Sequence, residues 1–371
     1  MSNPLVRLGR LGQSPWYDYI TRDLVTSGEL LRLIREDGLL GMTTNPTIFE
    51  KAIVGSDVYD ADVRRLSSDG CSPAEVVEAI AVGDVRAACD LFAPVYQRTG
   101  GRDGVVSLEV SPTLAHDTAG TIREAERLWA AVDRPNAMIK IPGTREGLPA
   151  VAHCIAAGIN VNVTLLFSVA RYAEVVAAYE EGLEARAARN RPLEQIASVA
   201  SFFVSRVDTM VDPLIDRAGG GAGELRGTIA TANAALAYRA FRRLTAAARW
   251  TALAARGARA QRPLWASTST KDPRYADLHY VEPLIAPDTV NTMPPETFAA
   301  YRDHGRPEIR IDAALAAADE HLARLEEVGI DLADVTARLE AEGVKKFAAS
   351  YESLLKGIES KMEALTVSGE R

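Results

Sequence analysis

The sequence is short of the residues that mark several classes of protein. It has three cysteines in 371 residues, Cys71, Cys89 and Cys154, which are too few and too far apart for a disulfide framework or a CxxC pair. Its five histidines show no paired ligand spacing, so no metal site and no metal cofactor are expected. No apolar run approaches about 18 residues, and residues 1–14 lack the apolar core of a signal peptide. A cytoplasmic protein without a membrane span is therefore predicted.

Basic charge is also scarce, because 42 lysines and arginines stand against 50 aspartates and glutamates, for a net charge of −8. This balance argues against nucleic acid and acidic membrane surfaces as partners. It does not exclude an anionic small substrate, since a local basic cluster can outweigh the negative net charge. The hydrophobic and charged fractions, 47% and 25%, are those of a globular chain. Length alone fits either two domains or one large α/β barrel.

Short apolar, β-branched runs alternate along the chain with helical patterns, such as those over 118–132, 168–183 and 228–259. This alternation predicts parallel strands joined by right-handed crossovers. We expect an α/β fold with a single (β/α)8 TIM barrel, because eight strands are predicted, near residues 14–19, 38–44, 105–110, 137–142, 159–166, 196–204, 263–268 and 279–285.

The last part of the chain departs from this alternation. From about residue 310 its apolar positions recur at three and four, which is typical of amphipathic helices that pack on an existing body. We therefore expect one domain over residues 1–371, in which about 310–371 form a C-terminal helical extension. These helices are compatible with closing the barrel, covering the active site or forming a dimer face, so a monomer and a homodimer both stay open.

Polar residues interrupt most of the predicted strands near their carboxyl ends. A strand buried on both faces is expected to be almost wholly apolar. In a β/α barrel the carboxyl ends of the strands meet at one rim, where active sites are built. Seven strands share this feature, and the residues are Asp18, Asn45, Glu109, Lys140, Asn162 with Thr164, Ser201 and Ser267.

Lys140 is the most informative of these residues, because it lies within the apolar segment AMIKIP. Burial in a barrel strand disfavours the ammonium form, and the neutral amine is the form that attacks a carbonyl to make a Schiff base. We predict that Lys140 is the nucleophile. The alternative is a structural lysine paired with Glu109 or Asp18.

Schiff-base chemistry requires proton transfers, which Asp18 and Glu109 can supply as acid and base, with a water held by Thr164. Asn45 and Asn162 offer neutral donors and acceptors suited to sugar hydroxyls. Asn45 also fits a simpler interpretation, since Asn-Pro within TTNPT favours a turn.

A phosphate site is predicted after the sixth strand. In SFFVSRVD, Ser201 ends the strand and Arg206 opens the next helix, so a hydroxyl, a guanidinium and a helix N-terminus converge. Lys271, just after WASTST, adds a second positive charge. A surface or salt-bridge role for Arg206 is the alternative.

Four motifs together resemble the transaldolase family: TTNPTIFEKAI from Thr43, MIKIPGT from Met138, GINVNVTLLFS from Gly158 and SFFVSRVD from Ser201. The agreement runs in order from WYDY to WASTSTKDPRY, and the length is similar to that of the longer bacterial and plant-type branch. The resemblance implies a class I aldolase barrel without a cofactor. It also implies transfer of dihydroxyacetone from sedoheptulose 7-phosphate to glyceraldehyde 3-phosphate, giving erythrose 4-phosphate and fructose 6-phosphate in the non-oxidative pentose phosphate pathway.

The resemblance also implies a role for each matching residue. Lys140 corresponds to the Schiff-base lysine, Asp18 to the proton-transfer residue at carbon–carbon cleavage, and Glu109 with Thr164 to the holders of the catalytic water. The substrate-binding positions are Asn45 and Asn162 for dihydroxyacetone, and Ser201 and Arg206 for the substrate phosphate. Ser267 is also expected to bind the substrate. Shorter transaldolases carry an arginine after strand seven that is missing here, and we expect Lys271 to replace it.

Two other functions fit part of the pattern. A simple aldolase keeps the lysine but releases free dihydroxyacetone, as in the related fructose 6-phosphate aldolases. A sugar-phosphate-binding barrel with a decayed site needs no chemistry. The second is disfavoured because every expected strand-end residue except the strand-seven arginine is present.

Overall fold

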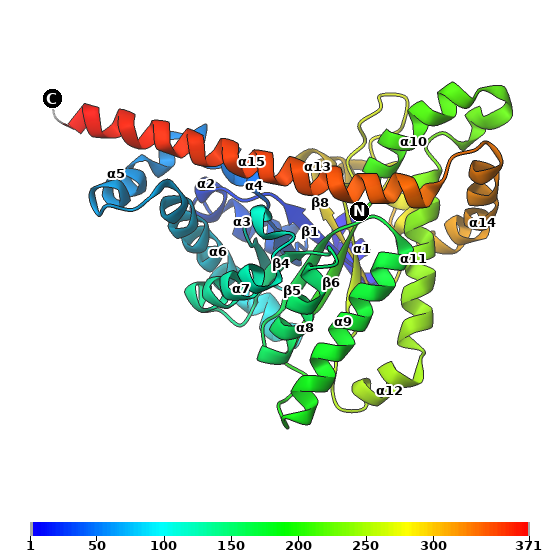
Figure 1. Ribbon diagram of the computed structural model, residues 1–371, viewed down its shortest axis with the longest axis horizontal. Helices are drawn as coiled ribbons and strands as arrows, with labels where there is room; N and C mark the ends of the chain where they lie inside the picture. Colours follow the sequence, from blue (N-terminus) through cyan, green and yellow to red (C-terminus); the bar gives the residue numbers. More distant parts are fainter. Residues whose placement is uncertain (1–2, 370–371) are drawn as a thin grey trace.

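Eight parallel strands close into a barrel in chain order, which confirms the predicted TIM-barrel fold. The computed structural model describes residues 3–369 (Figure 1). The strands are β1 Gln13–Asp18, β2 Gly41–Thr43, β3 Val105–Glu109, β4 Ala137–Pro142, β5 Val161–Leu166, β6 Ser198–Phe203, β7 Arg262–Ala266 and β8 Thr289–Met293.

Helices follow the strands and pack around the barrel (Figure 1). Before β4 they are α1 Pro4–Arg10, α2 Arg22–Thr26, α3 Glu29–Glu36, α4 Pro46–Phe49, α5 Asp60–Ser68, α6 Pro73–Arg98 and α7 Thr118–Val132. After β4 they are α8 Gly147–Ala157, α9 Val169–Ala188, α10 Ser205–Ala218, α11 Ile229–Thr245, α12 Ala248–Ala254, α13 Pro295–His304, α14 Ile311–Glu327 and α15 Leu332–Gly369. None of the helices within residues 3–369 is long and apolar enough to cross a membrane.

The prediction of the eighth strand at 279–285 is wrong. That segment contains the short 3-10 helix η5 Glu282–Leu284, and β8 lies at Thr289–Met293, paired with β1 from Gln13↔Thr289 to Tyr17↔Met293. The apolar run is explained by packing, since Leu284 and Ile285 are fully buried, and the Leu284 carbonyl accepts hydrogen bonds from two barrel side chains. The true strand, TVNTM, is rich in polar residues that are nevertheless buried, so its composition does not indicate a buried strand.

The single helix predicted over 228–259 is also wrong, because the chain breaks into α11 and α12. Ala247 adopts an extended conformation between them, with φ −73° and ψ 151°. The break turns α12 back toward the molecule and buries Trp250 and Leu253. Helical periodicity continues across the break because the sequence there is rich in alanine, which favours helix without marking its end.

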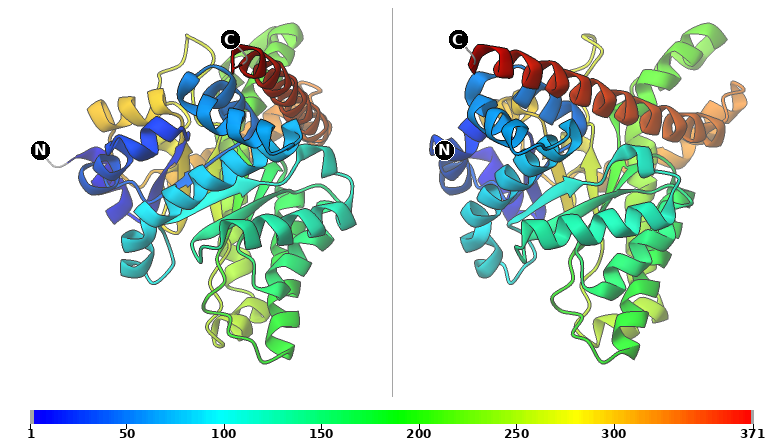
Figure 2. Two further views of the ribbon diagram at one scale, coloured as in Figure 1. Left: turned by 90° about the vertical axis from the view of Figure 1, so that its left-hand side faces the viewer. Right: turned by 60° about the vertical axis from the view of Figure 1, so that its left-hand side comes forward.

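The C-terminal helix α15 lies across one end of the barrel (Figures 1 and 2). A stripe of buried residues faces the body of the protein, and its members are Val335, Leu339, Phe347, Leu354 and Ile358. Polar contacts fix both halves of the helix, since Glu340 pairs with Arg171 at 3.4 Å and Lys361 pairs with Asp60 at 2.7 Å. The sequence is compatible with three roles for the C-terminal helices, and α15 has one of them, because it covers the mouth of the barrel.

Candidate active site

A cavity of about 580 Å³ opens at the carboxyl ends of the strands, beneath α15. Eight of the ten predicted site residues line it, namely Asp18, Asn45, Lys140, Thr164, Ser201, Arg206, Ser267 and Lys271. The other two, Glu109 and Asn162, are the direct neighbours of Lys140 on the adjacent strands, with registers Glu109↔Lys140 and Lys140↔Asn162. The structure therefore brings all ten predicted residues to one end of the barrel.

Lys140 and Glu109 form a buried pair near the floor of this cavity. The Lys140 Nζ atom lies 3.3 Å from Glu109 Oε2 and donates a hydrogen bond to the Thr44 carbonyl at 3.0 Å. Burial raises the pKa of the Glu109 carboxyl to about 7, and the positive charge of Lys140 opposes that rise. Apart from this ion pair, neither Glu109 oxygen has a hydrogen-bond partner among the described residues. A carboxyl group that titrates near neutrality and has free oxygens is suited to proton transfer.

Asp18 reaches the same cavity from the end of β1. Its Oδ1 atom accepts a hydrogen bond from Thr43 Oγ1 at 2.7 Å, and Thr43 is in turn bonded to Thr292 at 2.6 Å. Burial raises the pKa of the Asp18 carboxyl, while Lys140, the Thr43 hydrogen bond and Arg206 all oppose the rise. The hydroxyl pair fixes the carboxylate and leaves its second oxygen for a substrate.

Thr164 lies at an irregular part of β5. The pairing of β5 with β6 shifts register between Val163 and Leu166, and Leu165 has a φ of +61°, a conformation that a leucine rarely adopts. The Thr164 hydroxyl is buried and has no partner among the described residues. A strained bulge beside an unpartnered hydroxyl is typical of a functional site.

Asn162 lies beneath the cavity wall rather than on it. Its amide donates to Ser107 at 3.1 Å, and its carbonyl oxygen accepts from the Ser201 hydroxyl at 2.6 Å. Asn45 does line the cavity, and its side-chain oxygen caps α4 by accepting from the Ile48 N–H at 3.1 Å. The turn interpretation and the substrate-binding interpretation are therefore compatible for Asn45, because its amide nitrogen is left for a ligand.

Arg206 presents a half-buried guanidinium to the cavity without an ion pair or hydrogen bond among the described residues. Its Cζ atom lies 5.0 Å from the ring centre of Phe203 and 5.7 Å from that of Phe347. Burial lowers the pKa of Arg206, and Asp18 opposes that shift. An unpaired guanidinium held between two aromatic rings is expected to bind an anion.

Ser267 and Lys271 line the same cavity as Arg206. Ser267 has a φ of +56°, and its hydroxyl is bonded to that of Ser205 at 2.9 Å. Lys271 donates to the Ser269 hydroxyl at 2.7 Å. These contacts provide hydroxyls and a second cation beside the guanidinium.

Helix α15 adds site residues that sequence reasoning missed. Phe347 lies over the site, with its ring centre 5.8 Å from Lys140 Nζ, and Lys346 lines the same cavity. Lys51, in the π-helix η1 Glu50–Val54, is a further cation on the wall. No local signal in the segment KKF marks it as part of a site, because only the path of α15 over the barrel brings it there.

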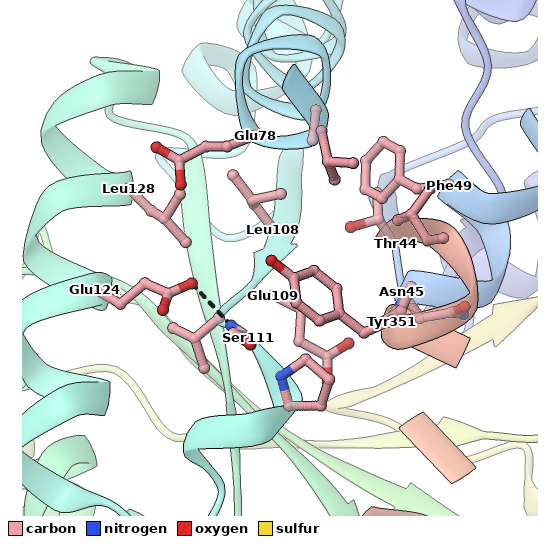
Figure 3. A pocket seen from close by; sticks show the side chains of 16 residues that line it. Thr44, Asn45, Phe49, Glu78, Leu108, Glu109, Ser111, Glu124, Leu128 and Tyr351 are labelled. Atoms are coloured by element: carbon pink, nitrogen blue, oxygen red, sulfur yellow. Dashed lines mark hydrogen bonds between the residues drawn. The ribbon is translucent and has the colours of Figure 1, made fainter. Parts of the chain in front are cut away.

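A second, smaller cavity of about 60 Å³ lies against Glu109, lined also by Asn45 and by Tyr351 of α15 (Figure 3). Figure 3 shows the Tyr351 ring next to Glu109, and the Ser111 N–H donating to Glu124 at 2.9 Å. A space of this size with several polar groups on its wall is large enough for a few water molecules.

Together these features define a class: a closed β/α barrel whose cavity at the strand ends holds a buried lysine paired with a carboxylate, and an arginine without an ion pair among the described residues. No group of three or more His, Cys, Asp or Glu within residues 3–369 is arranged to hold a metal ion.

Comparison with known sequences identifies the family within that class. The model of the Transaldolase/Fructose-6-phosphate aldolase family matches residues 15–358. The chain is 51% identical over 366 residues to a transaldolase of Acidothermus cellulolyticus, with 98% of each chain covered. It is 50% identical over 370 residues to a transaldolase of Thermobifida fusca, covering 99% of this chain and all of that one. A transaldolase of Trichodesmium erythraeum is 46% identical over 377 residues, with 99% of each covered. The chain belongs to the transaldolase/fructose-6-phosphate aldolase family and is an enzyme with transaldolase activity.

Proposed function

We propose that this enzyme transfers a dihydroxyacetone unit from sedoheptulose 7-phosphate to glyceraldehyde 3-phosphate, giving erythrose 4-phosphate and fructose 6-phosphate, through a Schiff base on Lys140. One observation carries the proposal. The buried Lys140 amine, beside two carboxylates, shares a cavity with the unpaired guanidinium of Arg206. A carbonyl-trapping group and an anion-binding group in one cavity suit a sugar phosphate.

In the first half-reaction Lys140 passes a proton to Glu109, 3.3 Å away, and the resulting amine attacks the C2 carbonyl of the ketose phosphate. The resulting carbinolamine loses its hydroxyl as water when Glu109 supplies a proton, which its pKa of about 7 allows near neutral pH. The ionised Asp18 carboxylate then takes the proton of the C4 hydroxyl. The C3–C4 bond breaks, its electron pair forms an enamine on Lys140, and erythrose 4-phosphate leaves.

The second half-reaction reverses these steps with the new acceptor. The enamine carbon attacks the aldehyde of glyceraldehyde 3-phosphate, and Asp18 returns its proton to the new hydroxyl. A water beside Glu109 and Thr164 hydrolyses the Schiff base and releases fructose 6-phosphate. The unpartnered oxygens of Glu109 and Thr164 support this position for the water.

The remaining residues bind the substrate in this proposal. Asn45 contacts the dihydroxyacetone hydroxyls directly. Asn162 acts with Ser201, to which it is bonded at 2.6 Å. Arg206, Ser267 and Lys271 hold the phosphate group at the end of the sugar remote from Lys140.

The decisive experiment is reductive trapping. The protein is incubated with fructose 6-phosphate, reduced with borohydride and digested, and the peptide containing Lys140 is expected to carry a reduced dihydroxyacetone unit or the whole sugar. Active protein with an unmodified Lys140 peptide would refute the lysine assignment. Turnover is also measured with and without erythrose 4-phosphate as acceptor, because equal rates without acceptor would indicate a simple aldolase.

We further infer a cytoplasmic location, with residues 1–371 acting as one domain, as a monomer or a homodimer. All three cysteines are free, and two of them, Cys89 and Cys154, are buried. The packing of α15 over the barrel supports the single domain, because its buried stripe faces the barrel and the helices around it.

A further inference from the structure

Helix α15 brings a further cation, Lys346, to the wall of the cavity that holds Arg206. We propose that Lys346 binds the substrate phosphate together with Arg206, and thereby sets the preference for phosphorylated over unphosphorylated sugars. This inference rests on the proposed function, whose Schiff-base step it leaves unchanged.

The position of Lys346 is fixed by its neighbours on α15. The next residue, Phe347, is 6% exposed and stacks on Arg206, the predicted phosphate-binding group. One turn earlier, Gly343 lies so close to β5 that an added Cβ would be 3.1 Å from Leu165 Cδ2. One turn later, Ser350 accepts a hydrogen bond from Thr47 at 3.0 Å. The helix cannot shift without losing these contacts, so the Lys346 side chain remains on the cavity wall.

The Lys346 amine is available for a ligand. Its one ion-pair partner among the described residues is Glu342, one turn away at 3.6 Å, and the Lys346 side chain is 68% exposed. An exposed pair at this distance contributes little, so a doubly charged phosphate competes with it easily. Lys271 is more constrained, because its amine is bonded to Ser269 at 2.7 Å and the next residue, Asp272, pairs with Arg226 at 3.3 Å.

Charge balance also favours a further cation beside Arg206 and Lys271. A phosphate monoester carries nearly two negative charges at neutral pH, which Arg206 and Lys271 together only just match. Two carboxylates, Asp18 and Glu296, line the same cavity and repel the phosphate. Lys346 offsets this repulsion from the side of the cavity opposite the strand ends, because it is carried by the covering helix.

The test compares Lys346→Ala with Lys345→Ala. The control removes the same charge from the adjacent residue of α15, which is exposed and lies off the cavity wall. Donor titrations with fructose 6-phosphate and with fructose are combined with inhibition by inorganic phosphate. For Lys346→Ala we expect the KM for fructose 6-phosphate and the inhibition constant of phosphate to rise about five- to tenfold, with the KM for fructose unchanged.

Three results would overturn the inference: equal constants in the two variants, an equal rise in the KM for fructose, or the whole loss reproduced by Lys271→Ala with none in Lys346→Ala. Borohydride trapping on Lys140 is run in parallel. Its absence in the unmodified protein would refute the proposed function itself, whereas retained trapping in Lys346→Ala with unchanged phosphate affinity would refute only the role of Lys346.

Discussion

The Glu109→Gln variant tests whether burial keeps the Glu109 carboxyl protonated up to about pH 7. Its pKa is about 7 in the folded protein against an ordinary value of 4.5, and its side chain is 3% exposed. Because the folded-state pKa is the higher of the two, at pH values between about 4.5 and 7 the Glu109 carboxyl is mostly protonated in the folded protein and mostly ionised in the unfolded chain. The contribution of Glu109 to the free energy of unfolding is fully present below about pH 4.5 and is lost as the pH rises through 7. Integrating the linkage from about pH 5 to pH 8 gives a loss of about 2–3 kcal/mol.

The assay is urea denaturation of both proteins at about pH 5, 6, 7 and 8, where the comparison is the change in unfolding free energy with pH. Any pH-independent effect of the substitution, such as a change in packing, cancels in that comparison. The ion pair with Lys140 forms only when Glu109 is ionised, and its effect is already contained in the folded-state pKa. The stability of the unmodified protein should fall by about 2–3 kcal/mol more than that of Glu109→Gln across this range. Parallel curves for the two proteins would refute the argument that burial holds this proton. The variant should also lose the ionisation near pH 7 from its pH–rate profile.

Three further predictions concern the site and its cover. Asp18→Asn should lower kcat by about 100-fold or more while the Schiff base of the intact sugar accumulates on Lys140, which mass spectrometry after borohydride reduction detects; normal turnover would contradict the role of Asp18 as base. Arg206→Gln should raise the KM for fructose 6-phosphate by about tenfold or more and leave that for fructose unchanged, and an equal change for both sugars would exclude a phosphate contact. Lys361→Ala removes the ion pair with Asp60 and hydrogen bonds to two carbonyls, so it should cost about 1–2 kcal/mol and speed amide hydrogen exchange in α15 beyond residue 350; unchanged exchange would show that the helix needs no such anchor.

The barrel could be predicted because most of its strands are buried on both faces and read as apolar runs. Lys140 stands out for the same reason, since it is a charged residue within the apolar segment AMIKIP. The eighth strand could not be found in this way, because Thr289, Asn291 and Thr292 are buried polar residues whose partners come from distant parts of the chain. Buried polar strands are recognisable only once those partners are known.

The site was predictable where its residues come from strand ends, and unpredictable where they come from α15. Strand order places Asp18, Glu109 and Lys140 together by topology alone. The amphipathic pattern of the last helix shows that one face is buried, and Phe347 belongs to that face. It does not show which surface the helix covers, so Lys346 looks like any exposed lysine in the sequence.

The path of α15 makes the cover of this site a later part of the fold to be synthesised than the barrel itself. All eight strands have left the ribosome once Met293 has emerged, so β8 is able to pair with β1 and close the barrel before α15 is made. At that stage Arg206 lacks one of its two aromatic neighbours, and the mouth lacks its cover. The nascent chain therefore passes through a stage at which the barrel can close while its mouth is still open to solvent.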